Sequence, residues 1–236
     1  MARRDGDVLS GSDPLNEAAA TWRERLRAAS PFGEVEICAA TKTVPPEAVN
    51  RLIGAGICTI GENRVQELTS KLPDLDPGFR IHMIGQLQRN KVKYIAREVD
   101  TIQSVDRIEL AEEIALRARQ ANRTIGVFIQ VNVAGEARKA GAPVEGLFPL
   151  VQAAARFEGI RVRGLMVMAP LSDDPEAARP VFRRARSLFE ELRDSAIEGV
   201  EMETLSMGMS GDCLVAAREG ATMVRLGSAL FGARAR

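Results

Sequence analysis

Short and nearly continuous apolar runs alternate with helical segments along this chain, and this alternation limits the possible folds more than any other feature. The strand candidates are residues 35–40, 58–61, 80–85, 100–105, 126–133, 162–168, 203–207 and 223–227. The helix candidates between them are residues 46–55, 63–71, 90–97, 106–120, 144–156, 176–194 and 211–219, and a further helix candidate at 15–29 precedes the first strand. Strand and helix therefore alternate over almost the whole sequence.

The apolar character of the strand candidates indicates a parallel sheet. A strand that is apolar on both faces must be covered on both faces, as happens when parallel strands are joined by helical crossovers. Eight such units in 236 residues predict one α/β domain, a single (β/α)8 TIM-type barrel with an extra N-terminal helix, over residues 14–236. A doubly wound open sheet has the same alternation and stays open as an alternative. Pro180 predicts a kink in the 176–194 segment or a later start of that helix.

The charge balance argues against a partner that is recognised through a global electric field. Lys and Arg together number 32, as do Asp and Glu, so the formal net charge is zero and neither nucleic acid nor a membrane surface is expected as a partner.

Residues 1–13 begin basic, continue rich in Asp, Gly and Ser, and contain no apolar run of signal-peptide length, so we expect a disordered start. The three cysteines are far apart and include no CxxC pair, which favours a reducing, cytoplasmic location and no metal site.

Small and polar residues follow the last two strand candidates, where barrels of this type commonly bind phosphate. The turn at 205–212 contains Ser210, and Arg225, Gly227 and Ser228 lie at the end of the eighth strand candidate. Hydroxyl groups and free backbone N–H groups from these two turns could converge on an anion. In a purely structural interpretation the glycines only permit tight turns and Ser210 caps the next helix.

A lysine and an asparagine follow the first two strand candidates. Lys42 comes directly after the small-residue run at 39–41, and an amine at the mouth of a barrel, facing a phosphate site, has the layout for carbonyl chemistry. An ordinary surface lysine is the alternative. Asn63 follows the second strand candidate, where its amide could contact a ring substituent or cap the next helix.

Other residues with reactive or polarizable side chains have mainly structural interpretations. His82 is the only histidine and lies in an apolar strand candidate, which is typical of a core histidine. Met166 and Met168 are expected to fill the barrel interior, although either could pack against a flat ring. Cys213 lies in the first turn of a helix candidate, where the dipole could favour a thiolate, but without a neighbouring acid or base it receives no catalytic role.

Taken together, the motifs resemble one known family, the pyridoxal phosphate homeostasis proteins, which are relatives of the N-terminal barrel of alanine racemase. The resemblance extends over nearly the whole chain and is carried, in order, by AATKTVPPEAV, IGENRVQEL, IHMIGQLQRNKV, QVNVAGEARKAG, VRGLMVMAP, LSMGMSGD and ATMVRLGSALFGAR. Two segments depart from the family pattern, QVNVAGEARKAG at 130–141 and the loop at 86–88. These departures put loop contacts in doubt and leave the cofactor residues unaffected.

The resemblance implies pyridoxal 5′-phosphate (PLP) as the cofactor, held as a Schiff base on Lys42. It implies that Ser210, Gly227 and Ser228 bind the phosphate, that Arg225 faces the pyridine nitrogen, and that Asn63 supports the ring. Further candidates for the cofactor pocket are His82, Met83, Met207 and Met209.

The implied arginine restricts the chemistry. A permanently charged Arg225 at the ring nitrogen keeps that nitrogen unprotonated, so the ring is a weak electron sink. Racemisation also needs a second base opposite Lys42. In alanine racemases a tyrosine of an appended domain supplies it, whereas this chain ends at Arg236 and its only tyrosine, Tyr94, is expected on the outside of the barrel.

The leading hypothesis is therefore a PLP-binding protein of intracellular vitamin B6 homeostasis without a dedicated reaction. Its expected partners are PLP and PLP-dependent apo-enzymes as recipients, and a monomer is expected. Two alternatives stay open, a single-domain PLP-dependent amino-acid racemase and a barrel enzyme for a phosphorylated sugar.

Overall fold

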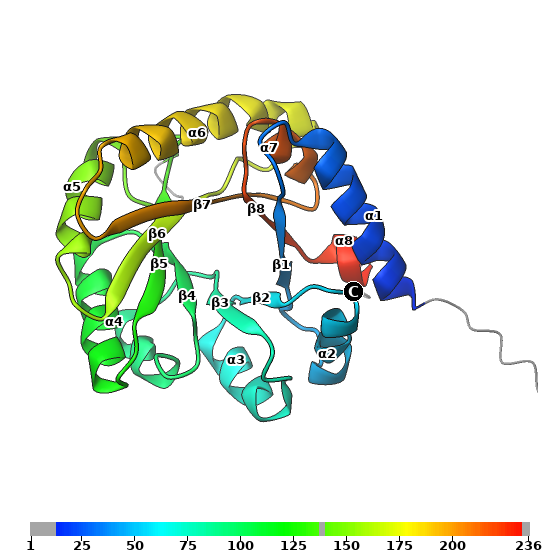
Figure 1. The fold of residues 1–236 in the computed structure, drawn as a ribbon, viewed down its shortest axis with the longest axis horizontal. Helices are drawn as coiled ribbons and strands as arrows, with labels where there is room; N and C mark the ends of the chain where they lie inside the picture. Colours follow the sequence, from blue (N-terminus) through cyan, green and yellow to red (C-terminus); the bar gives the residue numbers. More distant parts are fainter. Residues whose placement is uncertain (1–12, 137–139, 233–236) are drawn as a thin grey trace, which may run out of the picture.

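The computed structural model describes residues 13–136 and 140–232, and it is a closed barrel of parallel strands in chain order (Figure 1). The expectation of disorder at 1–13 falls, except for Asp13, outside the described residues, as does part of the segment at 130–141. The strands are β1 (Glu36–Ala40), β2 (Thr59–Glu62), β3 (Arg80–Met83), β4 (Thr101–Val105), β5 (Ile125–Val131), β6 (Ile160–Val167), β7 (Val200–Met209) and β8 (Met223–Leu226). Pairing of β1 with β8, which sets Cys38 beside Arg225, closes the barrel and excludes the open-sheet alternative.

Helices surround this barrel and separate the strands, as the sequence predicts. They are α1 (Pro14–Ala29), α2 (Pro46–Gly54), α3 (Val65–Lys71), α4 (Ile108–Gln120), α5 (Val144–Ala155), α6 (Arg179–Asp194), α7 (Cys213–Arg218) and α8 (Ser228–Phe231), with 3₁₀ turns η1 (Leu72–Asp74), η2 (Arg89–Tyr94) and η3 (Pro175–Ala178). The extra helix α1 packs beside α7 and α8 (Figure 1). Within the described part of the chain, no helix is both long and apolar enough to cross a bilayer.

Three elements differ from the predicted ones. The segment expected as a helix at 90–97 is the 3₁₀ turn η2, and the segment at 176–194 divides into η3 and α6. Helix α6 begins at Arg179 with Pro180 in its first turn, where the missing proline N–H has no helical acceptor to lose, so the later start is confirmed. The short helix α8, directly after β8, was not predicted.

Two apolar layers make up the core, as the alternation of side chains along each strand requires. The larger layer lies between the strands and the helices, and α4 contributes to it one continuous face that includes Leu110, Ile114 and Ala118. A small second cluster of Cys38, Phe128, Met166 and Met223 lies inside the barrel, beside buried polar side chains that include His82 and Gln103. The barrel is therefore a packed core, with room for chemistry only at its ends.

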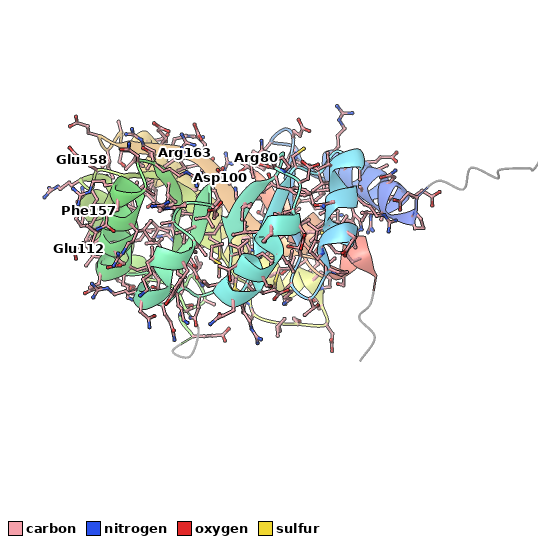
Figure 2. All side chains as sticks on the ribbon, turned by 90° about the horizontal axis from the view of Figure 1, so that it is seen from below. Arg80, Asp100, Glu112, Phe157, Glu158 and Arg163 are labelled. Atoms are coloured by element: carbon pink, nitrogen blue, oxygen red, sulfur yellow. The ribbon has the colours of Figure 1, made fainter. Side chains whose placement is uncertain are left out.

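Charged side chains occupy the end of the barrel at which the strands begin. Figure 2 shows Arg80, Asp100 and Arg163 along this end. Arg80 pairs with Glu36 at 2.6 Å, and Arg163 pairs with Glu201 at 3.3 Å. Ion pairs of this exposed kind contribute little to stability. The cavity beside Arg80 and Glu36 measures about 180 Å³, whereas a larger one lies at the opposite end of the barrel.

Candidate functional site

Lys42 lies at the end of the barrel at which the strands finish, two residues after β1. It lines a cavity of about 770 Å³ together with Gly227 and Ser228, and residues of α1, α2 and α8 complete the wall. The lysine is partly buried rather than fully exposed. The structure thus brings an amine to the same cavity as the turn after β8, as the sequence analysis expected.

Ser210 bridges the turns that follow β7 and β8. Its Oγ accepts hydrogen bonds from the N–H groups of Gly227 at 3.4 Å and Ala229 at 3.3 Å. The alternative that Ser210 caps the next helix is wrong, because Asp212 is the residue that precedes α7. A Cβ atom on Gly227 would lie 3.3 Å from the Ala40 carbonyl oxygen, so the two backbones approach closely here. Two backbone N–H groups thus converge on one oxygen atom, in an arrangement that an anion could also accept.

Arg225 is a buried cation held by oxygen atoms that carry no formal charge. Its Nη1 donates to the carbonyl oxygen of Ser206 at 2.9 Å and to the Ser206 hydroxyl at 2.7 Å, and its Nη2 donates to the carbonyl oxygen of Val167 at 2.9 Å. Burial lowers the pKa of the guanidinium, an effect that the fields of Cys38 and Asp212 oppose. A buried charge bonded only to neutral oxygens is costly, which favours a functional reason for keeping it.

His82 lies in the barrel interior at the far end of a polar chain. The Ser206 hydroxyl donates to Gln103 Oε1 at 2.7 Å, and Gln103 Nε2 lies 2.8 Å from His82 Nδ1. Burial lowers the pKa of His82 to about 4, so the ring is neutral and its Nδ1 accepts the amide proton. His82 also meets Phe128 edge-on. It is a hydrogen-bonded interior residue linked to Arg225.

Asn63 has a buried oxygen with nothing to bind. It follows β2 directly, and among residues 13–136 and 140–232 neither Asn63 Oδ1 nor the neighbouring Glu62 Oε2, both buried, has a hydrogen-bond partner. Asn63 does not cap α3, which is preceded by Arg64 and has no side-chain cap. An orphaned buried acceptor calls for a donor from a bound group or from water.

The methionine candidates occupy different positions in the barrel. Met83 and Met207 are fully buried in the layer between strands and helices, because their neighbours His82 and Ser206 point inward. Met209 is half-buried at the mouth. Met166 fills the interior as expected, whereas Met168 lies beyond the end of β6 with 45% of its surface exposed, so the expectation that both fill the interior is wrong for Met168.

The surroundings of two further residues, Cys213 and Tyr94, do not favour a reactive role. Burial raises the pKa of Cys213 to about 11, which outweighs any effect of the α7 dipole. Tyr94 is 54% exposed on η2, with the ammonium groups of Lys91 and Lys93 over its ring, and its expected position on the outside of the barrel is confirmed.

Three charged residues beside Lys42 were not predicted from the sequence. The Nζ of Lys71 donates to Glu62 Oε1, Glu67 Oε1 and the Thr41 carbonyl oxygen, each at 2.8 Å. The available signal was the i, i+4 spacing of Glu67 and Lys71, together with an unusual glutamate, Glu62, at the end of an apolar strand candidate.

The chain is similar to known proteins over most of its length. Residues 15–235 match the family model described as "Alanine racemase, N-terminal domain". The pyridoxal phosphate homeostasis protein of Aquifex aeolicus is 44% identical over 89% of this chain and 94% of its own length, and that of Escherichia coli is 34% identical over 85% and 86%.

Solved structures show the same likeness. PipY of Synechococcus elongatus, in a structure with PLP bound, matches with a TM-score of 0.81 and 34% identity over 92% of this chain and all of its own. An alanine racemase of Clostridium difficile, only 13% identical with a TM-score of 0.72, shares the fold, and this chain covers 57% of its length. The extent and identity of these matches show that the chain belongs to the pyridoxal phosphate homeostasis protein family, within the fold of the alanine racemase N-terminal domain.

Proposed function

We propose that this protein holds PLP as a Schiff base on Lys42 and acts in intracellular PLP homeostasis without a dedicated catalytic reaction. The observation that carries the proposal is that Lys42 lines one cavity with Gly227 and Ser228, while the Ser210 hydroxyl accepts a hydrogen bond from the Gly227 N–H, so an amine and a set of phosphate donors lie close together. The names of the curated relatives and the PLP bound to PipY support the same assignment.

The residues at the mouth fit this cofactor. PLP supplies an aldehyde that condenses with a lysine amine, with loss of water, and a phosphate that needs N–H and O–H donors. In this proposal Lys42 provides the amine, while Ser210, Gly227 and Ser228 provide the phosphate donors. Asn63, with its unpartnered buried oxygen, is available to the ring.

Arg225 supports a role in binding rather than in a reaction. In this proposal its guanidinium faces the pyridine nitrogen and, as a permanent cation, keeps that nitrogen unprotonated. Its bonds to the Ser206 and Val167 carbonyl oxygens hold it in one orientation. A second proton-transfer group opposite Lys42 is also required for racemisation, and Tyr94 is too far to the outside to serve.

The remaining parts of the proposal concern the surroundings of the protein. PLP-dependent apo-enzymes are the proposed recipients of the cofactor, and a monomer is the proposed oligomeric state. The free thiols of Cys38, Cys58 and Cys213 support a reducing, cytoplasmic location.

The test is covalent capture of added PLP. We expect the purified protein to develop a visible absorption band with PLP that collapses on borohydride reduction, and peptide mass spectrometry should then locate a pyridoxyl group on Lys42. Lys42→Ala should lose the band, whereas Lys93→Ala, a control on the outer turn η2, should keep it. A colourless protein, or equal labelling of both variants, would sink the proposal.

A second measurement separates binding from racemisation. The PLP-loaded protein is incubated with alanine in deuterated water, and deuterium at Cα is measured by NMR. Incorporation no faster than with free PLP supports the homeostasis role. Rapid turnover with inversion would replace it by a single-domain racemase.

A further inference from the structure

Both peptide groups that flank Lys42 are held by one salt bridge. On one side the Thr41 carbonyl oxygen accepts a hydrogen bond from Lys71 Nζ at 2.8 Å. On the other side the Thr43 N–H donates to Glu67 Oε1. Lys71 and Glu67 are themselves paired at 2.8 Å, so the contacts close a ring around the backbone of Lys42.

A buried carboxylate anchors this ring to the barrel. Glu62, the last residue of β2, is fully buried, and its Oε1 accepts from Lys71 Nζ at 2.8 Å and from the Thr41 hydroxyl at 2.7 Å. Lys71, the last residue of α3, is also buried. A long, flexible lysine that is buried between two carboxylates has lost most of its freedom, so the ring is rigid.

The ring encloses a strained backbone. Thr43 has φ of 65°, in the left-handed region that a β-branched residue avoids. Such a conformation persists only where the surroundings over-determine it, and strain of this kind gathers at functional sites. Here the bond from Thr43 N–H to Glu67 supplies that constraint directly beside Lys42.

We propose that the Glu67–Lys71 pair, anchored on Glu62, is a positioning device that presets the Lys42 turn for covalent capture of PLP. These residues act through the backbone on either side of Lys42. The inference rests on the proposed function and goes beyond it, because it assigns a role to charged residues that need not contact the cofactor. If the proposal is right, the Glu67–Lys71 pair affects the rate at which Lys42 forms the Schiff base and does not affect the affinity for the phosphate.

The experiment compares Glu67→Ala with a matched control. Glu113→Ala breaks another i, i+4 pair, Glu113–Arg117 at 2.7 Å on α4, which lies away from Lys42. The rate of capture is measured by borohydride quenching and mass spectrometry of the Lys42 peptide. We expect Glu67→Ala to slow capture by about tenfold or more, since small misplacements of a reacting group have effects of this order. Glu113→Ala should stay at the wild-type rate.

Two further readouts separate positioning from general damage. Pyridoxine 5′-phosphate has the phosphate but no aldehyde, so Glu67→Ala should bind it as tightly as wild type does. Thr43→Gly removes the strain, because glycine adopts φ of 65° freely, and it should restore most of the capture rate in the Glu67→Ala background. If the alanine variant does not fold, Glu67→Gln, which keeps the side-chain volume, should show the same slowing to a smaller degree.

The outcomes are distinguishable. Wild-type capture rates in both Glu67 variants, or equal losses for PLP and pyridoxine 5′-phosphate, would overturn the positioning role. Failure of the wild-type protein to capture PLP on Lys42 would instead overturn the proposed function.

Discussion

The Arg225 guanidinium donates to both the carbonyl oxygen and the hydroxyl of Ser206, so one residue of β7 orients one residue of β8 through two contacts. The Ser206 hydroxyl in turn donates to Gln103. The orientation of Arg225 therefore depends on residues of β4, β6 and β7. A substitution of Gln103 can alter this orientation through Ser206.

Removal of the Ser210 hydroxyl should weaken phosphate binding. Ser210→Ala deletes one donor and leaves the N–H groups of Gly227 and Ala229 unchanged. A charge-assisted hydrogen bond is worth about 1.5 kcal/mol, so we expect the Kd for PLP to rise about tenfold. The Kd for pyridoxal, which lacks the phosphate, should not change. Ser187→Ala is the control, because its hydroxyl lies on α6 and donates to the Arg183 carbonyl oxygen. An equal effect for both ligands would contradict the assignment.

Acid should weaken the fold through His82. The pKa of His82 is about 4 in the folded protein and near 6.5 when unfolded, so the unfolded chain binds more protons between these values. The stabilisation is therefore complete above about pH 6.5 and is lost as the pH falls toward 4, by about 3 kcal/mol at most.

Urea unfolding at pH 7 and pH 4.5 measures this effect. His82→Gln keeps an acceptor for Gln103 but cannot titrate, so its free energy of unfolding should fall less between the two pH values. If the free energy of unfolding falls equally in the variant and the wild type, protonation of His82 is not the cause of the loss of stability in acid.

Thiol reagents should label one cysteine in the native protein. Cys58 is exposed, whereas burial raises the pKa of Cys38 to about 12 and that of Cys213 to about 11. Because the thiolate is the reactive form, these two should stay unlabelled near pH 8 until the protein unfolds. Mass spectrometry after a short treatment with iodoacetamide measures this. Labelling of Cys213 at the rate of Cys58 would contradict the buried position of α7.

Neutralising Lys71 should destabilise the protein strongly. Lys71→Met leaves the carboxylate of Glu62 buried without its cation, and breaking a buried pair in this way costs about 3–5 kcal/mol. Arg117→Met breaks the more exposed pair with Glu113, for which the loss should be below about 1 kcal/mol. Urea unfolding of the two apoproteins makes the comparison, and similar losses would show that the Glu62–Lys71 pair is not special.

The strands and most helices could be predicted because each depends on local periodicity. The convergence of Lys42 with Gly227 also followed from the sequence, since strands one and eight of a closed barrel are neighbours. The segment at 90–97 was wrongly predicted as an α-helix, and the 3₁₀ turn at Arg89–Tyr94 takes its place, because so short a segment does not show by its pattern whether it forms an α-helical or a 3₁₀ turn. The contact of Lys71 with the Thr41 carbonyl oxygen joins residues 30 positions apart, and no local pattern encodes it.

Helix α1 has a consequence for the other end of the chain. Its Trp22 Nε1 donates to the carbonyl oxygen of Ala229 at 3.0 Å, and the N–H of Ala229 donates to Ser210. The N-terminal helix α1, which is not part of the eight strand–helix units, thus holds in place the turn after β8, whose N–H groups could bind an anion. Replacing Trp22 would remove this contact, so we expect a bound phosphate to be released faster, although Trp22 itself is not among the residues that line the cavity.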